Sequence, residues 1–328
     1  METLKVEYLV INENRGAFCN SVDTFNKLLQ VNSDIEIKKN TLTFQNNYKI
    51  DYKVKTGQLK DKNQRFFHVA LVLYDDDPDI LKLTELTRTI KKVIHESGGQ
   101  PETLWDDISF YYAKESYPLI YEIENLMRKL ITNFMLTNIG KRWVDESVPI
   151  EVKSALEMTK RKDYINVLHK IDFIHLADFL FKPYQINSSA VLFKKLEAAK
   201  SLEGIDLTEL KSFIPRSNWE RYFSKIVECE DSYLKKRWAS LYDSRCKVAH
   251  NAFIDKGDYK SIIKITRELK EILNRAINSL DKIYIPEEDK EDIADNVASN
   301  INELYGKFIK QWNVLTTHLI ETASYYKI

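Results

Sequence analysis

The chain has 328 residues, of which 44% are hydrophobic and 30% are charged. This balance is typical of a globular chain with a large core and excludes a disordered one, and the length suggests two domains. Because 49 basic and 49 acidic residues give a formal net charge of zero, any nucleic-acid surface must be local.

Residues 1–108 are predicted to form a small mixed α/β domain with a sensing or regulatory role. Strands are predicted at residues 4–11, 36–38, 41–45, 48–54 and 66–74, and helices at 23–29 and 79–95. The strand at 66–74 is apolar on both faces, which predicts a central place in the sheet. Gly98-Gly99-Gln100-Pro101 is typical of a helix stop. The order of these elements predicts a small sheet with helices on one face.

Residues 109–328 are predicted to form an all-α domain, so the fold class is α+β. A stripe of apolar residues at helical spacing runs from Leu119 to Phe134. Further helices are predicted at 149–159, 171–181, 189–202, 207–213, 259–283 and 291–325, and one or two helices at 219–242. The last helix carries apolar residues close to a heptad seam, which suits either packing on its own domain or a subunit contact.

One short segment contains several side chains that can bind or react with a ligand: Ser244-Arg245-Cys246-Lys247-Val248-Ala249-His250-Asn251. It combines an anion-binding cation, an imidazole that can move protons near neutral pH, and a hydrogen-bonding amide. Residues five apart on a helix lie about 140° apart. Arg245 and His250 can therefore converge if the segment is partly non-helical, if the arginine wraps round, or if two chains contribute. Asp243-Ser244 reads as a helix boundary, which predicts Arg245 at a helix entrance and His250 a turn further on.

The motif and its setting resemble a known family. Arg-x4-His followed by Asn, within Trp238-Ala239-Ser240-Leu241-Tyr242-Asp243-Ser244-Arg245-Cys246-Lys247-Val248-Ala249-His250-Asn251, is similar to the signature of HEPN-superfamily ribonucleases. Tyr121-Glu122-Ile123-Glu124-Asn125-Leu126-Met127-Arg128-Lys129-Leu130 resembles the first long helix of that domain. The resemblance implies a HEPN-type helical domain with insertions over about residues 110–285, and metal-independent endonucleolytic cleavage of RNA by a homodimer. Such domains recur in toxin–antitoxin pairs, abortive infection and other anti-phage systems, which implies a possible antitoxin or defence-system partner.

The chemistry fits these residues, because RNA carries its own nucleophile in the 2′-hydroxyl. We expect His250 to move a proton at the reacting phosphate, an effect of about 10²–10⁴-fold. Arg245 is expected to pair with the non-bridging oxygens, and Asn251 to orient the histidine or bind the phosphate. Lys247, Glu122 and Glu124 are candidate substrate-binding residues.

Other readings stay open. A HEPN fold that keeps its motif can serve as a non-catalytic RNA- or protein-binding or dimerisation module. The carboxylates at residues 75–79 could hold Mg²⁺, or cap the helix that follows. Cys19, Cys229 and Cys246 show no metal-ligand spacing, so we expect reduced thiols, no metal, no cofactor and a cytoplasmic location. The sequence shows no signal-peptide pattern and no apolar run long enough to span a membrane.

Overall fold

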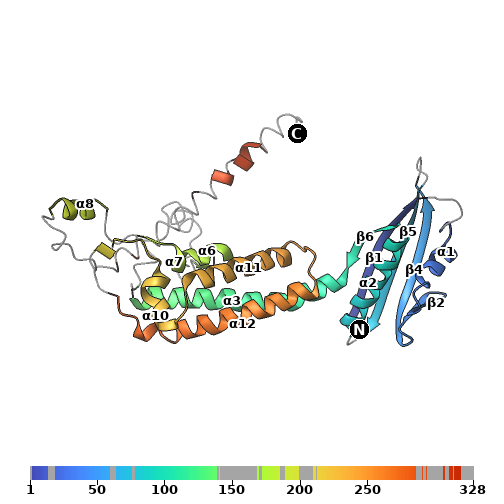
Figure 1. The fold of residues 1–328 in the computed structure, drawn as a ribbon, viewed down its shortest axis with the longest axis horizontal. Coiled ribbons are helices and arrows are strands. Elements are labelled where there is room, and N and C mark those ends of the chain that lie inside the picture. Colours follow the sequence, from blue (N-terminus) through green and yellow to red (C-terminus); the bar gives the residue numbers. More distant parts are fainter. Residues whose placement is uncertain are drawn as a thin grey trace, which may run out of the picture. The chain divides into compact units, whose positions relative to one another are not determined.

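The computed structural model describes residues 2–13, 19–59, 64–75, 78–138, 140, 168–169, 172–184, 189–198, 210–211 and 213–285, with isolated residues between 290 and 318. The chain divides into two compact units (Figure 1). Met1–Ser116 and Lys247–Tyr259 form the sheet unit, and Tyr117–Cys246 and Lys260–Ile328 form the helical unit. The segment that follows Arg245 and carries His250 therefore belongs to the sheet unit, although it lies far from the other residues of that unit in the sequence.

The sheet unit is built on one six-stranded antiparallel sheet with the order β2-β3-β4-β5-β1-β6. Its strands are β1 (Glu2–Glu13), β2 (Ile35–Lys38), β3 (Thr41–Phe44), β4 (Tyr48–Gln58), β5 (Gln64–Asp75) and β6 (Gln100–Asp106). The predicted central position of β5 is confirmed, because it lies between β4 and β1. The helices α1 (Val22–Leu29) and α2 (Ile80–Glu96) agree closely with the predicted ones.

The edge strand β6 was not predicted. Gly98, with φ of 83°, and the bond from the Gly99 N–H to the Ile94 carbonyl (3.0 Å) do end α2, as expected. The chain then enters a strand at once and pairs with β1, with a register shift at Glu7/Tyr8. Most residues of β6 are exposed, so the strand lacks the alternation that marks a half-buried strand. Pro101 is tolerated because β6 is at the edge of the sheet.

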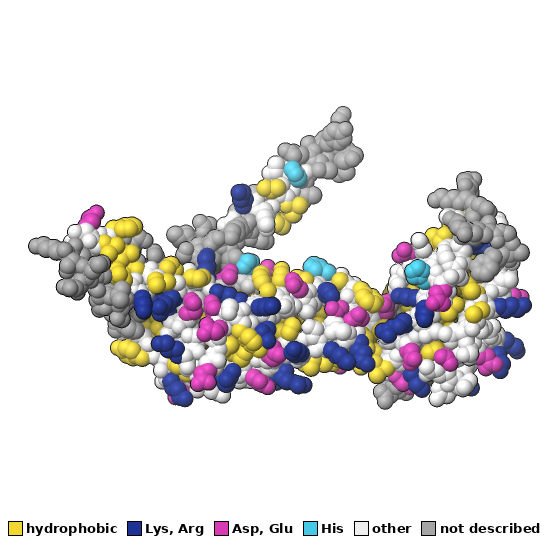
Figure 2. All heavy atoms as spheres, viewed as in Figure 1, with side chains coloured by type: hydrophobic (Ala, Val, Ile, Leu, Met, Phe, Trp, Pro, Cys, Tyr) yellow, Lys and Arg dark blue, Asp and Glu magenta, His cyan; other side chains and the backbone are white. Residues whose placement is uncertain are grey.

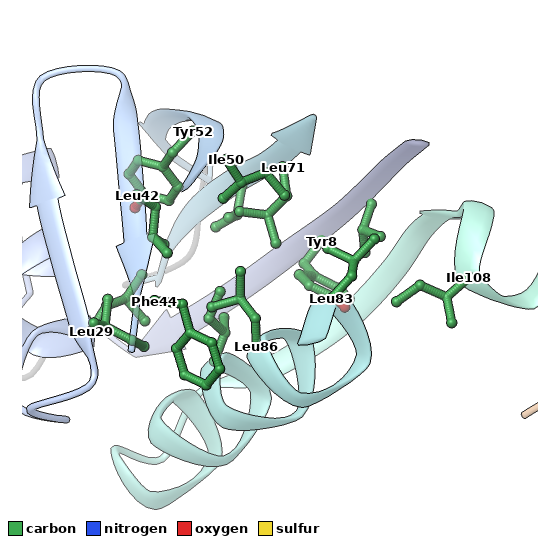
Figure 3. Packing of buried hydrophobic residues seen from close by; sticks show 14 of the residues in the cluster. Tyr8, Leu29, Leu42, Phe44, Ile50, Tyr52, Leu71, Leu83, Leu86 and Ile108 are labelled. Atoms are coloured by element: carbon green, nitrogen blue, oxygen red, sulfur yellow. The ribbon is translucent and has the colours of Figure 1, made fainter. Parts of the chain in front are cut away.

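The core of the sheet unit lies between one face of the sheet and the two helices (Figure 3). Val6, Tyr8 and Val10 are buried, whereas the residues between them on β1 are only partly buried. Phe25 of α1 stacks on Phe67 of β5 with ring centroids 4.4 Å apart. Because side chains alternate across a strand, both helices cover this one face and not the opposite one, which we call the open face.

The helical unit is organised around α3 (Asp107–Asn138), α11 (Asp231–Ala249) and α12 (Lys256–Ile277), which run side by side (Figure 1). The predicted apolar stripe on α3 is buried at Ile120, Ile123, Met127, Leu130, Ile131 and Phe134. An ion pair from Lys270 Nζ to Glu122 Oε1 (2.6 Å) joins α12 to α3. A second ion pair, between Arg237 and Glu268, joins α11 to α12.

The helical unit also contains shorter elements and a buried aromatic cluster. The shorter elements are α6 (Phe173–Leu176), α7 (Asp178–Phe181), α8 (Ser189–Ala198), the π-helix η3 (Trp219–Phe223), α10 (Ser224–Val227) and the 3-10 turn η4 (Leu280–Lys282). Trp238 stacks on Phe173 at 4.1 Å, and its indole N–H donates to the Phe173 carbonyl at 3.0 Å. Trp219 is fully buried between Phe181 and Phe223.

Several predicted helix bounds were wrong. The helix expected at 171–181 is two short helices. The region 219–242, expected as one or two helices, is divided at Glu228, whose φ is 52°, and its second helix continues to Ala249 instead of ending at Tyr242. The helix expected at 259–283 is α12, which begins at Lys256 and ends at Ile277. The helix expected at 149–159, most of 207–213 and most of 291–325 lie outside the described residues, as does most of the heptad seam; its described members Trp312 and Leu315 are exposed. Among the described residues, no helix combines the length and apolarity needed to cross a membrane.

Candidate active site at the end of helix α11

Helix α11 is continuous through the candidate motif, so the helix boundary predicted at Asp243-Ser244 is wrong. Serine and aspartate often begin helices, but here the Ser244 hydroxyl donates to the Ser240 carbonyl at 3.1 Å, one turn back in the same helix. Arg245 therefore lies near the end of α11 and not at a helix entrance. His250 directly follows the last helical residue, Ala249.

The chain leaves α11 through a Schellman turn that gives Asn251 a structural role. The Ala252 N–H donates to the Lys247 carbonyl at 2.9 Å, and the Asn251 N–H donates to the Val248 carbonyl at 3.4 Å. Asn251 has φ of 52°, the left-handed conformation that this turn requires and that asparagine tolerates better than most residues. Its position after the histidine is thus explained by backbone geometry, which the sequence analysis did not anticipate.

Helix α12 begins only a few residues later, with a reciprocal cap. The Asp258 N–H donates to Asp255 Oδ1 at 2.9 Å, and the Asp255 N–H donates to Asp258 Oδ2 at 3.3 Å. Such a capping box specifies where the helix starts. Lys247 Nζ, predicted to bind substrate, lies 2.8 Å from Asp258 Oδ1 on the surface. The Asp-x-x-Asp pattern of this cap was available in the sequence but was not used.

Ile254 fixes the connecting loop to the sheet unit. Its side chain is 1% exposed and belongs to the core cluster under the sheet. Its N–H donates to the Ser109 hydroxyl at 2.8 Å, a contact between residues 145 positions apart. Tyr259, at the start of α12, packs against Tyr112 with ring centroids 5.6 Å apart. The turn that contains His250 is thus held by a core built mainly from residues 4–112.

Arg245 and His250 themselves serve none of these structural roles. Arg245 is half-buried and His250 is exposed. Within the part of the chain that the structure describes, neither side chain makes a hydrogen bond or an ion pair. The thiol of Cys246, hydrogen bonded to Tyr242, raises the pKa of that phenol, while the positive charge of Arg245 opposes the rise. Both side chains of the predicted pair are therefore available to a ligand.

Glu122 and Glu124 are both engaged elsewhere in the helical unit. Glu122 pairs with Lys270, and Glu124 Oε1 lies 2.5 Å from Arg128 Nη2 on the next turn of α3. Arg128 also donates from Nε to the Leu168 carbonyl at 3.2 Å. Among the described residues, no hydrogen bond or ion pair joins either glutamate to Arg245. Glu122 thus helps to hold α3 against α12, and Glu124 orients Arg128 within α3.

Of the carboxylates that follow β5, the structure describes Asp79, which has a structural role. Asp79 is the N-cap of α2, and its Oδ1 accepts from the Lys82 N–H at 3.0 Å. Asp76 and Asp77 lie outside the described residues. Within the described ranges, His, Cys, Asp and Glu side chains do not gather in any group of three or more that could hold a metal ion.

In the face shown in Figure 2, Lys and Arg side chains are interspersed with Asp and Glu. Comparisons with protein-family models, with curated proteins and with solved structures find no match to this chain.

Proposed function

We propose that this chain is a metal-independent endoribonuclease whose reacting groups are Arg245 and His250. The proposal depends on one observation: some residues of the motif make structural contacts and others do not. Lys247 pairs with Asp258, and Asn251 forms the left-handed turn, so both contribute to structure. Arg245 and His250 make no hydrogen bond or ion pair among the described residues, and they supply the two functions that favour phosphodiester cleavage in RNA, charge stabilisation and proton transfer.

In the proposed reaction, the ribose 2′-oxygen attacks the adjacent phosphorus and the bond to the 5′-oxygen breaks. The His250 imidazole takes the proton from the 2′-hydroxyl or gives a proton to the departing 5′-oxygen, and water supplies or accepts the other proton. The products are a 2′,3′-cyclic phosphate and a 5′-hydroxyl end. The Arg245 guanidinium pairs with the non-bridging oxygens and offsets the charge that accumulates on them. The RNA supplies the nucleophile, so no serine, cysteine or metal-bound water is needed.

We further propose that two copies of the chain build the site. Because α11 is helical through Ala249, the partly non-helical arrangement that would bring both groups to one side is lost. Residues five apart on a helix point about 140° apart. Facing motifs from a symmetric dimer would place the arginine of one copy beside the histidine of the other. We assign this enzyme to the cytoplasm, in a toxin-like or anti-phage role in which a protein partner restrains it.

The direct test is cleavage of total RNA and of one defined transcript by the purified chain, with and without EDTA. Wild type should cut both and should be unaffected by the chelator. His250→Ala and Arg245→Ala should each lose about 10²-fold or more. Arg88→Ala and His95→Ala are matched controls, because both residues are exposed on α2, and they should cut normally. Full activity in either motif variant would exclude the mechanism, and binding of RNA without cleavage by wild type would favour a non-catalytic module.

A mixing experiment tests the dimer. In an equal mixture of Arg245→Ala and His250→Ala chains, half of the dimers contain both variants. Each mixed dimer keeps one intact pair if the arginine and histidine come from different copies. Activity should then recover to about a quarter of the wild-type value. A mixture as inactive as either variant alone would contradict the pairing across two copies.

A further inference from the structure

The open face of the sheet carries an ordered set of side chains that the proposed cleavage does not use. The strand registers place Gly57, Phe66 and Ile11 in one row across β4, β5 and β1. The next row contains Lys55, His68 and Leu9. All of these residues point away from α1 and α2, since their neighbours along each strand face the core.

Lysines line the β4 side of this face. Lys49, Lys53 and Lys55 are exposed and alternate along the strand, with Asp51 between the first two. Neighbouring lysines at alternate positions lie about 7 Å apart. In the described part of the chain, none of the three makes an ion pair. With one acid, Asp51, among three lysines, this edge of the face carries a local excess of positive charge on a protein whose overall charge is zero.

An aromatic platform lies beside the lysines. A Cβ atom on Gly57 would lie 2.6 Å from Phe66 Cε1, so the Phe66 ring covers the bare backbone of Gly57. His68 follows on the same face, directly opposite Lys55. On β6, Trp105 is 51% exposed, and Lys5 Nζ lies 4.5 Å from the centroid of its ring. Glu7 pairs with both Lys5 (3.0 Å) and His68 (3.4 Å), so the cations left without an ion pair are the lysines of β4 beside Phe66. An aromatic ring next to such lysines forms a surface suited to unstacked bases and their phosphates.

We propose that this open sheet face binds single-stranded RNA, with Phe66 stacking on a base and Lys49, Lys53 and Lys55 contacting phosphates. Unpaired bases are required because a duplex hides the faces of its bases from a flat sheet. A protein occupant would need a row of acids to match the lysines, whereas any nucleic-acid strand supplies its charges at regular intervals. The inference rests on the proposed function in one respect: the bound strand is the substrate that reaches the motif.

The test uses a fluorescein-labelled 2′-O-methyl oligouridylate of about 12 nucleotides and the full chain, with binding read by anisotropy. This probe lacks the nucleophile, so its binding is independent of cleavage. Wild type and His250→Ala should bind equally. Lys53→Gln with Lys55→Gln should weaken binding about tenfold and reduce the dependence of log K on log salt by about 1.4. Phe66→Leu, which keeps an apolar side chain, should weaken binding by about 5- to 100-fold.

The matched control is Lys27→Gln with Lys92→Gln, which removes the same charge from the helices that cover the other face. The control should bind like wild type. No binding by wild type, unchanged binding by the Lys53/Lys55 pair, or an equal loss in the control would each overturn the inference. Conversion of a wild-type dimer to a monomer by the Lys53/Lys55 changes, seen by sedimentation, would assign the face to self-association and would also overturn it. Binding that persists while wild type cuts no RNA would leave this inference standing and remove the proposed nuclease.

Discussion

Replacing Ile254 with alanine should destabilise the sheet unit although Ile254 lies far along the chain from every strand. The side chain is 1% exposed and packs in the core under the sheet. The change removes three carbon atoms, which corresponds to about 2.4 kcal/mol of lost transfer free energy. The cavity left behind adds to this loss, so the free energy of unfolding should fall by about 3–4 kcal/mol, within the range seen for such substitutions.

Hydrogen exchange measured by mass spectrometry can locate this loss. Slowly exchanging amides of β1 and β5 should exchange roughly 100- to 1000-fold faster, because each 1.4 kcal/mol is a factor of ten. Peptides around Phe173 and Trp238 in the helical unit should keep their protection. Ile254→Val should cost only about 0.5–1.5 kcal/mol. Unchanged exchange in β1 and β5, or an equal loss in both units, would show that the residue does not belong to the core of the sheet unit.

Two further predictions concern stability. Asn251→Ala should lower the free energy of unfolding by about 1 kcal/mol, because alanine is strained at positive φ, while Asn251→Gly should stay near wild type and still cut RNA. Equal urea midpoints for the two variants would contradict the backbone role of Asn251. The hydrogen bond from Arg237 lowers the pKa of Glu268 below 4.5, so this pair stabilises the fold above about pH 4.5 and loses its effect as the pH falls through the lower folded value. Glu268→Gln should therefore flatten part of the acid-induced loss of stability, and an unchanged pH profile would contradict this.

Local patterns in the sequence predicted the strands and helices whose buried apolar residues recur at the spacing typical of that element. The apolar residues of β5 indicated a central strand, and the spacing of Leu83, Leu86 and Ile90 indicated α2. The strand β6 was invisible because an exposed edge strand has no buried period. The continuity of α11 was missed because serine and aspartate have strong preferences for helix starts, whereas Ser244 satisfies its hydroxyl inside the helix. Contacts such as Ser109 with Ile254 carry no local signal at all.

The candidate site could be predicted only in its chemistry. The residue types at 245 and 250 indicated anion binding and proton transfer. They did not indicate whether hydrogen bonds or ion pairs within the chain already occupy these two side chains. The structure supplies that information by showing how the rest of the segment is used: Asn251 turns the chain and Ile254 fixes the loop in the core. A sequence pattern alone does not separate a residue needed for the turn from one needed for the reaction.

The separate roles of Asn251 and Ile254 in structure, and of Arg245 and His250 in the proposed reaction, can be tested in one experiment. If the segment were only a connection between two helices, changes at Arg245 and His250 would alter neither stability nor any activity. If it is a catalytic turn held by the core, substitutions at Asn251 and Ile254 should lower stability. Substitutions at Arg245 and His250 should lower the cleavage rate under conditions where every variant is folded. Measuring unfolding midpoints and cleavage rates for substitutions at all four positions compares the two accounts directly. Cleavage and stability that rise and fall together across the four positions would leave the motif with a structural role alone.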